Sequence, residues 1–155
     1  MRTFIGIDLG STTTKAVVMD ENSAILGRGI TNSRSNYDTA TRVAKHEALI
    51  DTRFTLFRHG LGGLAFGEGQ LEQFLAELER AFRFEQYLEQ LGELERVCSD
   101  NAHGERFREV QAKVRDALAE VFGQLRHDAP ELFAPGAKRK SDFFRDIAGS
   151  RFMAI

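Results

Sequence analysis

The spacing of hydrophobic residues changes along the chain, and its amino-terminal part has the pattern of β-strands. Between Thr3 and Thr31, apolar and β-branched residues form short runs separated by turn residues at Gly10-Ser11 and at positions 20–23. Runs of this kind are typical of strands joined by tight turns. We expect Gly27 and Gly29 to weaken the last of these strands. The pattern predicts an antiparallel β-meander with strands at Thr3 to Asp8, Thr12 to Met19 and Ala24 to Ile30.

A polar loop and one helix are predicted after the strands. Asp38 ends the polar loop and is suited to cap a helix that runs to about Phe57. Glycines are frequent from 60 to 69, so this stretch is the candidate hinge before the rest of the chain. The buried stripe of the helix is expected to consist of Val43, Leu49, Ile50 and Phe54.

The remainder of the chain has helical spacing, with apolar residues three and four positions apart. A first long helix is predicted from Leu71, Phe74, Leu75, Leu78, Phe82, Leu88, Leu91 and Leu94. After a break near 99–104, a second helix is predicted from Phe107, Val110, Val114, Leu118, Val121 and Leu125. The two helices are expected to pack as a hairpin. Pro130 and Pro135 predict a loop, and Ser141 or Asp142 predicts the start of a last helix.

Composition and charge restrict the kinds of partner. The 155 residues, 42% hydrophobic and 28% charged, have the balance of a soluble globular protein. A formal net charge of −2 supplies no overall field to attract nucleic acid, so anion binding must be local. The single cysteine, Cys98, excludes an intramolecular disulfide framework and suits a reducing compartment. The sequence has neither a signal peptide nor a membrane-spanning run, so we expect a cytoplasmic protein without a membrane partner.

The stretch DLGSTTTK, from Asp8 to Lys15, has the pattern of a phosphate-binding turn between two strands. The first predicted strand ends at Asp8, and the turn that follows exposes backbone N–H groups. The hydroxyls of Ser11, Thr12 and Thr13 lie beside these groups, and such turns can hold phosphate oxygens. The spacing is that of neither a Walker A loop nor a dinucleotide-binding fingerprint.

The other residues of this stretch also have chemical reasons to be there. Gly10 lets the backbone approach a ligand, and Lys15 supplies a positive charge. Asp8 is the candidate catalytic residue because its carboxylate can hold Mg²⁺ through water. Strand alternation points Thr14 away from Thr13 and Lys15, so Thr14 is expected to be a bystander. The alternative is a plain hairpin whose threonines are only good strand formers.

The stretch GIDLGSTTTKAVVMD, residues 6–20, resembles the first phosphate motif of the superfamily that contains actin, sugar kinases and Hsp70-type chaperones. More narrowly, the chain is similar to the ATPase subunits of ATP-dependent benzoyl-coenzyme A reductase, of the BadF/BadG/BcrA/BcrD type. The larger subunit, which has a helical insertion, is favoured. The narrower resemblance rests on SRSNYDTATRVAKHEALIDTRFTLF (33–57), FRFEQYLEQL (82–91) and KRKSDFFRDIAGSRFMA (138–154).

The resemblance implies an α/β fold and a division of the chain. Residues 1–59 would begin a partial actin-like, ribonuclease H-like lobe, formed by the antiparallel β-meander and a helix. Residues 60–69 would be a hinge, 70–137 an inserted helical hairpin, and 138–155 the start of a further, truncated helix. Because the family's second phosphate loop and adenosine-binding segment do not occur here, we expect an amino-terminal portion of a longer protein.

The resemblance also implies cofactors and partners. ATP and Mg²⁺ would bind at the phosphate motif, and ATP hydrolysis would drive electrons toward an aromatic acyl-coenzyme A. In the complete protein a four-iron–four-sulfur cluster is shared between two ATPase subunits, and none of its ligands is expected in this chain. The implied partners are a second ATPase subunit, the catalytic reductase subunits and a low-potential donor such as ferredoxin.

Two other functions and several less specific features remain open at this stage. The chain is also compatible with an activator of a 2-hydroxyacyl-coenzyme A dehydratase, although such activators lack the helical insertion, or with a non-catalytic helical interaction module.

Cys98 is expected to be a core or surface thiol, and the four histidines have no metal-site spacing. The Lys138-Arg139-Lys140 run either docks an anionic group or is a solvated face. Phe82, Phe84 and Tyr87 line either a subunit contact or the hairpin core.

Overall fold

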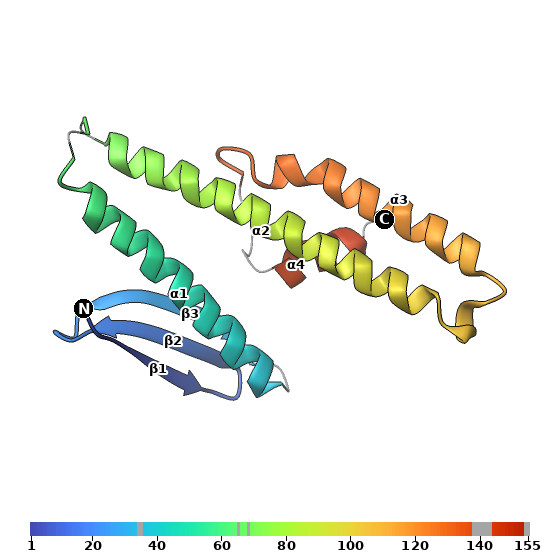
Figure 1. The fold of residues 1–155 in the computed structure, drawn as a ribbon, viewed down its shortest axis with the longest axis horizontal. Helices are drawn as coiled ribbons and strands as arrows, with labels where there is room; N and C mark the ends of the chain where they lie inside the picture. The colour runs from blue at the N-terminus through green and yellow to red at the C-terminus, as the bar shows by residue number, and fades with distance from the viewer. Residues whose placement is uncertain (34–35, 65, 68, 138–143, 154–155) are drawn as a thin grey trace. The chain divides into compact units, whose positions relative to one another are not determined.

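The computed structural model describes residues 1–33, 36–64, 66–67, 69–137 and 144–153. An antiparallel sheet is followed by helices, which confirms the predicted α/β class with its amino-terminal β-meander. Figure 1 shows the elements in this order: β1 (Thr3–Leu9), β2 (Thr13–Asp20), β3 (Ile25–Asn32), α1 (Tyr37–Leu61), α2 (Gln70–Ala102), the 3₁₀ turn η1 (Glu105–Phe107), α3 (Gln111–Leu132) and α4 (Phe144–Phe152).

The chain divides into two compact units, Met1–Leu75 and Ala76–Ile155. The boundary falls inside α2, whereas α1 continues to Leu61, into the range predicted as a hinge. A hinge at 60–69 and the four-part division of the chain therefore stay predictions. Each unit has its own cluster of buried side chains and is described by itself below.

The three strands pair in the order β1-β2-β3, and both pairs are antiparallel. The turn between β2 and β3 is held by Asp20, whose Oδ1 accepts the backbone N–H groups of Asn22 and Ala24, each at 2.8 Å. Ser23 in this turn has a φ of 65°, in the left-handed region that a short polar side chain tolerates. These turn contacts thus help to form the predicted β-meander. Most strand ends differ by one or two residues from the predicted ends.

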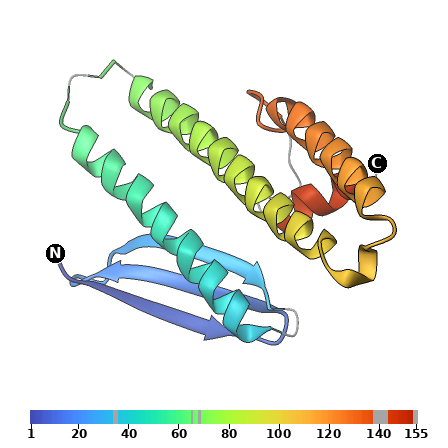
Figure 2. The same cartoon turned by 45° about the vertical axis from the view of Figure 1, so that its right-hand side comes forward.

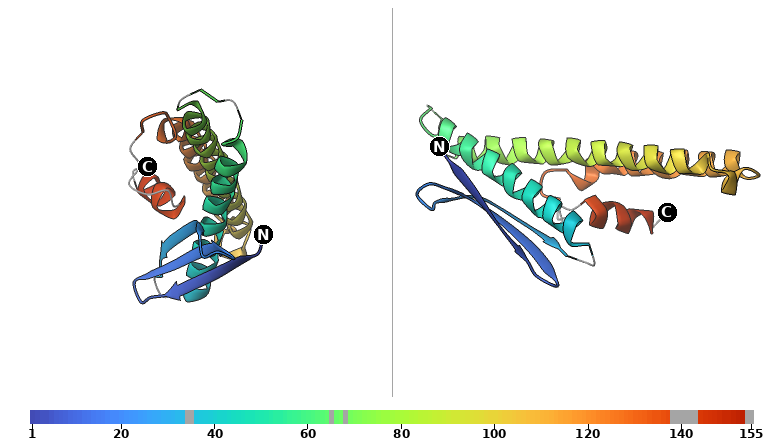
Figure 3. Two further views of the ribbon diagram at one scale, coloured as in Figure 1. Left: turned by 90° about the vertical axis from the view of Figure 1, so that its left-hand side faces the viewer. Right: turned by 60° about the horizontal axis from the view of Figure 1, so that its bottom comes forward.

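Helix α1 packs on one face of the sheet through small residues (Figure 3). A Cβ atom at Gly29 would collide with the backbone of Ala44 and Ala48, and one at Gly27 would collide with Thr52. The two glycines, expected only to weaken β3, therefore allow the helix backbone to lie directly on this strand. The buried core of this unit consists of Ala16, Val18, Leu26, Ala44 and Ala48.

The close approach changes which side chains of α1 are buried. Helical residues four apart, namely Ala40, Ala44, Ala48 and Thr52, are buried against the sheet, because only short side chains fit there. Of the predicted stripe, only Ile50 is fully buried, while Val43, Leu49 and Phe54 are half-buried. The prediction of a stripe made of large residues was wrong, since it ignored the glycines on the partner strand.

The amino-terminal cap of α1 is Asn36, not Asp38 as predicted. Asn36 Oδ1 accepts the backbone N–H of Thr39 at 2.9 Å, which satisfies one of the helix's free donors. Asp38 instead lies in the first turn, where its carboxylate is 3.1 Å from the Arg42 guanidinium. Either residue type can cap a helix, and the chain begins the helix two residues earlier than the pattern suggested.

Helices α2 and α3 form the predicted hairpin, and Figure 2 shows them side by side and antiparallel. Arg126 of α3 forms an ion pair with Glu95 of α2. Tyr87 belongs to the buried core, against which Phe84 packs, whereas Phe82 remains 38% exposed. The core of this unit consists of Tyr87, Leu91, Phe122, Leu125, Ala129, Phe133, Ile147 and Ala148.

Several details of the helical prediction were wrong. Phe74, predicted to belong to the apolar face of the first long helix, is 45% exposed and stacks on Phe66, with ring centroids 6.5 Å apart. Val110 precedes α3 and is exposed. Pro130 lies inside α3, which continues to Leu132 because Ala129 and Phe133 on either side of this proline are buried in the core. The described part of the last helix begins at Phe144; the predicted start at Ser141 or Asp142 and the Lys138-Arg139-Lys140 run lie outside the described residues.

Candidate functional site

The turn from Gly10 to Thr13 joins β1 to β2 and is closed by its own backbone. The Gly10 N–H donates to the carbonyl oxygen of Thr13 at 3.1 Å. A Cβ atom at position 10 would lie 2.7 Å from that same oxygen, so the turn requires glycine here for a structural reason. The role expected for Gly10 beside a ligand stays a prediction.

Ser33, the residue after β3, holds the turn from the side. Its backbone N–H donates to the carbonyl oxygen of Thr12 at 2.9 Å, and its hydroxyl donates to the carbonyl oxygen of Gly10 at 2.6 Å. The carbonyl oxygens of Gly10, Thr12 and Thr13 are thus all turned toward protein donors. Sequence reasoning missed Ser33, because it lies 23 residues from Gly10 and belongs to no local motif.

Two amides of the turn, unlike these three carbonyls, have no hydrogen-bond partner among the described residues. Ser11 and Thr12 are exposed, and among the residues that the structure describes no group accepts a hydrogen bond from their backbone N–H groups. Successive amides that face outward can bind the oxygens of an anion such as phosphate. The hydroxyl groups of these two residues belong to the same exposed segment.

Asp8 and Lys15 are direct cross-strand partners next to the turn. Because Thr14, Ala16 and Val18 are buried toward α1, strand alternation places both charged residues on the opposite face of the sheet. Both side chains are exposed, and no hydrogen bond or ion pair engages either charge within the described ranges. A carboxylate and an ammonium group thus stand beside a turn in which two amides have no acceptor among the described residues.

Thr14 makes a contact that the sequence did not suggest, while its expected role as a bystander stays a prediction. Its predicted direction, away from Thr13 and Lys15, is confirmed by its complete burial. Its hydroxyl is 2.8 Å from the hydroxyl of Ser33, which in turn holds the Gly10 carbonyl. A buried hydroxyl that connects to the phosphate-binding candidate was invisible in the sequence, because Ser33 is 19 residues away from Thr14.

The donor set at this site fits Mg²⁺ in the presence of a phosphate ligand. Mg²⁺ is commonly held by one or two carboxylates together with substrate phosphates and water, and Asp8 supplies one such carboxylate. The described residues contain no cluster of three or more acidic, histidine or cysteine side chains that could hold a metal on their own. An iron–sulfur cluster does not fit this chain, because Cys98 is its single cysteine and packs against the helical core.

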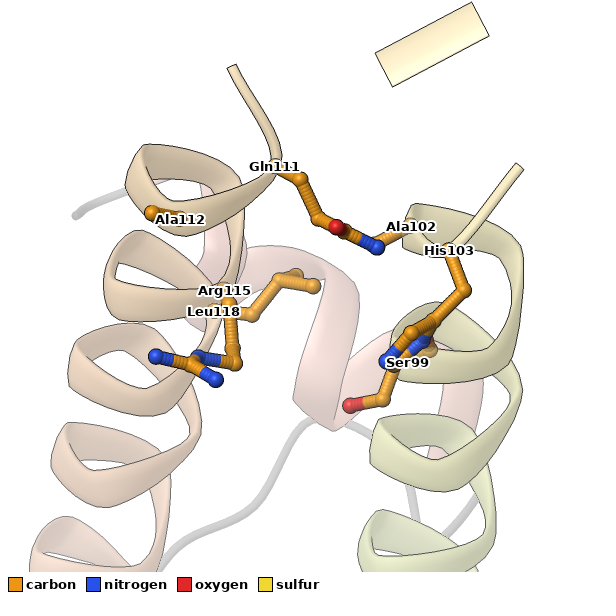
Figure 4. A pocket seen from close by; sticks show the side chains of 7 residues that line it. All are labelled: Ser99, Ala102, His103, Gln111, Ala112, Arg115 and Leu118. Carbon is orange, nitrogen blue, oxygen red and sulfur yellow. The ribbon is translucent and has the colours of Figure 1, made fainter. Parts of the chain in front are cut away.

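A cavity of about 210 Å³ lies in the other unit, between the end of α2 and the start of α3 (Figure 4). His103 Nδ1 lies 2.7 Å from the carbonyl oxygen of Ser99 and therefore donates its hydrogen there. The cavity contains none of the residues predicted for phosphate binding. Its lining consists of Ser99, Ala102, His103, Gln111, Ala112, Arg115 and Leu118.

Comparison with known proteins supports the family, but not the individual enzyme, that the sequence resembles. Within the described ranges, no helix has the length and apolarity needed to cross a membrane. Neither curated proteins nor solved structures give a match to this chain. A family model does match, over residues 5–137, which include the strands, the turn and both helices of the hairpin. The chain therefore belongs to the BadF/BadG/BcrA/BcrD ATPase family.

Proposed function

We propose that the Gly10–Thr13 turn binds the phosphates of MgATP, with Asp8 and Lys15 completing the site. Membership of an ATPase family makes ATP the general substrate. The observation that carries the assignment is the division of polar groups in the turn. The carbonyl oxygens of Gly10, Thr12 and Thr13 accept hydrogen bonds from protein donors, whereas the amides of Ser11 and Thr12, beside the Asp8 and Lys15 pair, have no acceptor among the described residues.

Each residue has a distinct role at the phosphates. The amides of Ser11 and Thr12 donate hydrogen bonds to phosphate oxygens, and the hydroxyls of this segment, with that of Thr13, add further donors. The Lys15 ammonium neutralises phosphate charge, and the Asp8 carboxylate holds and orients the metal's water ligands. Mg²⁺, when bound, stabilises the charge that develops on the transferred phosphoryl group.

Isothermal titration calorimetry with three ligands tests this function. ATP should bind with Mg²⁺ present, ADP should bind more weakly, and adenosine should give no measurable heat, because the site recognises phosphates. Asp8→Asn should make ATP binding insensitive to removal of Mg²⁺ by EDTA, whereas Asp38→Asn, on α1, should behave like the unmodified protein. Absence of ATP binding in every condition would favour the non-catalytic helical interaction module.

We further propose that ATP hydrolysis in the complete protein drives low-potential electron transfer for reduction of an aromatic acyl-coenzyme A, as in benzoyl-coenzyme A reductase. Support comes from the resemblance of residues 33–57 and 82–91 to the ATPase subunits of that enzyme. The long α2–α3 hairpin, which dehydratase activators are understood to lack, is further support. On this proposal the partners are a second ATPase subunit, the catalytic subunits and a ferredoxin-like donor in the cytoplasm. The shared cluster would then take its ligands from outside this chain.

The electron-transfer proposal is tested in extracts of the source organism. A strain whose gene carries Asp8→Asn should lose ATP-dependent reduction of benzoyl-coenzyme A, while a strain with Asp38→Asn should retain it. Loss of 2-hydroxyacyl-coenzyme A dehydration with intact ring reduction would instead assign the chain as a dehydratase activator. Retention of both activities in the Asp8→Asn strain would contradict both assignments.

A further inference from the structure

The geometry points to Ser33 and Thr14 as positioning residues of the phosphate-binding turn: their buried hydroxyls fix the direction of the Ser11 amide. This inference rests on the proposed function, since it names what orients the phosphate donors. Neither residue faces the ligand side of the sheet. Ser33 is 2% exposed and Thr14 is fully buried.

The direction of each hydrogen bond follows from the number of hydrogens available. The Ser33 hydroxyl donates its one hydrogen to the Gly10 carbonyl oxygen at 2.6 Å. In the 2.8 Å contact between the two hydroxyls, Thr14 must therefore be the donor and Ser33 the acceptor. The result is a directed relay from Thr14 through Ser33 to Gly10, within a buried environment where each bond is stronger than in water.

Because the peptide bond is planar, these hydrogen bonds also fix an amide on the side where the ligand would bind. The Gly10 carbonyl and the Ser11 N–H belong to one rigid peptide unit and point in opposite directions. When the Ser33 hydroxyl holds the Gly10 oxygen toward the protein, the Ser11 N–H is therefore held outward. In the same way, the Ser33 backbone N–H fixes the Thr12 carbonyl and with it the Thr13 N–H of the same peptide unit.

Removing the hydroxyl should release the peptide unit rather than unfold the sheet. The Gly10 oxygen would lose a buried donor. The free energy of a turn with this peptide unit flipped or mobile would then be close to that of the observed turn. A turn whose amides have no fixed direction binds phosphate less well, because ordering it is then part of the cost of binding. The β-meander itself keeps its ladder, which involves neither side chain.

Four variants of the full chain separate positioning from general stability. Ser33→Ala removes the hydroxyl that touches the turn. Thr14→Val removes the relay's donor while keeping the shape of the side chain, and Thr14→Ser keeps the hydroxyl while removing a methyl group. Thr52→Val is the matched control, because among the described residues this buried hydroxyl bonds to the Ala48 carbonyl of its own helix alone, at 2.7 Å.

Two measurements are made on each variant: amide hydrogen exchange of Gly10 by NMR, and MgATP affinity by calorimetry. Ser33→Ala should accelerate exchange and weaken binding about tenfold, the effect of one buried hydrogen bond. Thr14→Val should change both in the same direction, and should add nothing when combined with Ser33→Ala. Thr14→Ser and Thr52→Val should exchange and bind like the unmodified chain.

The outcomes distinguish this inference from the proposed function. If the unmodified chain binds MgATP and Ser33→Ala binds equally well with unchanged exchange, the positioning role is wrong while the phosphate site stands. If Thr52→Val weakens binding as much as Ser33→Ala, the effect is one of stability and the positioning role is again wrong. If no form binds MgATP, the proposed function fails and the inference fails with it.

Discussion

Asp8 of β1 and Lys15 of β2 are paired directly across the strands, on the sheet face opposite to α1. Opposite charges at such positions usually form an ion pair, yet both side chains here are exposed, beside a turn whose Ser11 and Thr12 amides have no acceptor among the described residues. A phosphate group with a bound Mg²⁺ would pair with both side chains, the metal ion with the carboxylate and the phosphate with the ammonium group. On the proposed function, Asp8 would hold the metal and Lys15 would neutralise phosphate charge.

Asp8→Asn should separate binding from turnover in the assembled protein. The substitution keeps the size of the side chain but removes the charge that holds the metal. We expect ATP turnover to fall roughly a hundredfold, the scale on which single electrostatic groups act in a transition state, with a much smaller loss of ATP affinity. Steady-state phosphate release measures the first effect and calorimetry the second. Normal turnover in Asp8→Asn would remove this residue from the mechanism.

Gly29→Ala should loosen α1 from the sheet. The added methyl group would collide with the backbone of Ala44, which side-chain rotation cannot relieve, so we expect a loss of about 1–3 kcal/mol or more in stability. Native-state hydrogen exchange of β2 and β3 amides measures this loss in the Met1–Leu75 unit alone. Gly6→Ala is the matched control, because a Cβ at that position meets no atom within 4 Å. Equal stability of the two variants would show that the helix does not lie as closely on β3 as described.

Arg58 should control the titration of Glu72 at the junction of α1 and α2. A side-chain hydrogen bond from Arg58, with a smaller coulombic contribution, holds the pKa of Glu72 below its usual range. Arg58 Nε and Nη2 lie 2.9 and 3.0 Å from the two carboxylate oxygens. The Glu72 pKa, followed by carboxyl carbon NMR, should therefore rise in Arg58→Ala and stay unchanged in the control Arg53→Ala. An unchanged Glu72 pKa in both variants would mean that the ion pair does not form in solution.

The sign of the pH effect follows from the direction of this shift. A carboxyl group whose pKa is lower in the folded state stabilises that state at pH values above its unfolded pKa. The contribution disappears as the pH falls through the folded pKa. Because Glu72 and Arg58 are both solvent-exposed, the change in global stability should be small.

The strands and the Gly10–Thr13 turn between the first two of them were predictable because their signals are local. Turn residues separate short β-branched runs, and Gly10 lies where the close approach to the Thr13 carbonyl requires a glycine. Strand alternation then gave the correct direction for Thr14. These features depend only on neighbours in the sequence, which is the information that a pattern contains.

The features that the sequence did not predict depend on distant partners. Which face of α1 is buried is decided by Gly27 and Gly29 on another element, so the small residues are buried more deeply than the large ones. The position of Pro130 inside α3 depends on core packing, which outweighs the local preference for a loop. The contact of Ser33 with the turn joins residues 23 positions apart. None of these relationships has a local signature.

The most direct test of the phosphate site compares two lysines of opposite placement. Lys15 stands on the sheet beside the turn, whereas Lys45 is exposed on α1, which covers the other face. Replacing either lysine by alanine removes the same charge from the protein. The dissociation constant of MgATP, measured by calorimetry at fixed ionic strength, should rise about tenfold or more in Lys15→Ala and stay within about twofold in Lys45→Ala. Equal affinities of the two variants would contradict phosphate binding at the Gly10–Thr13 turn.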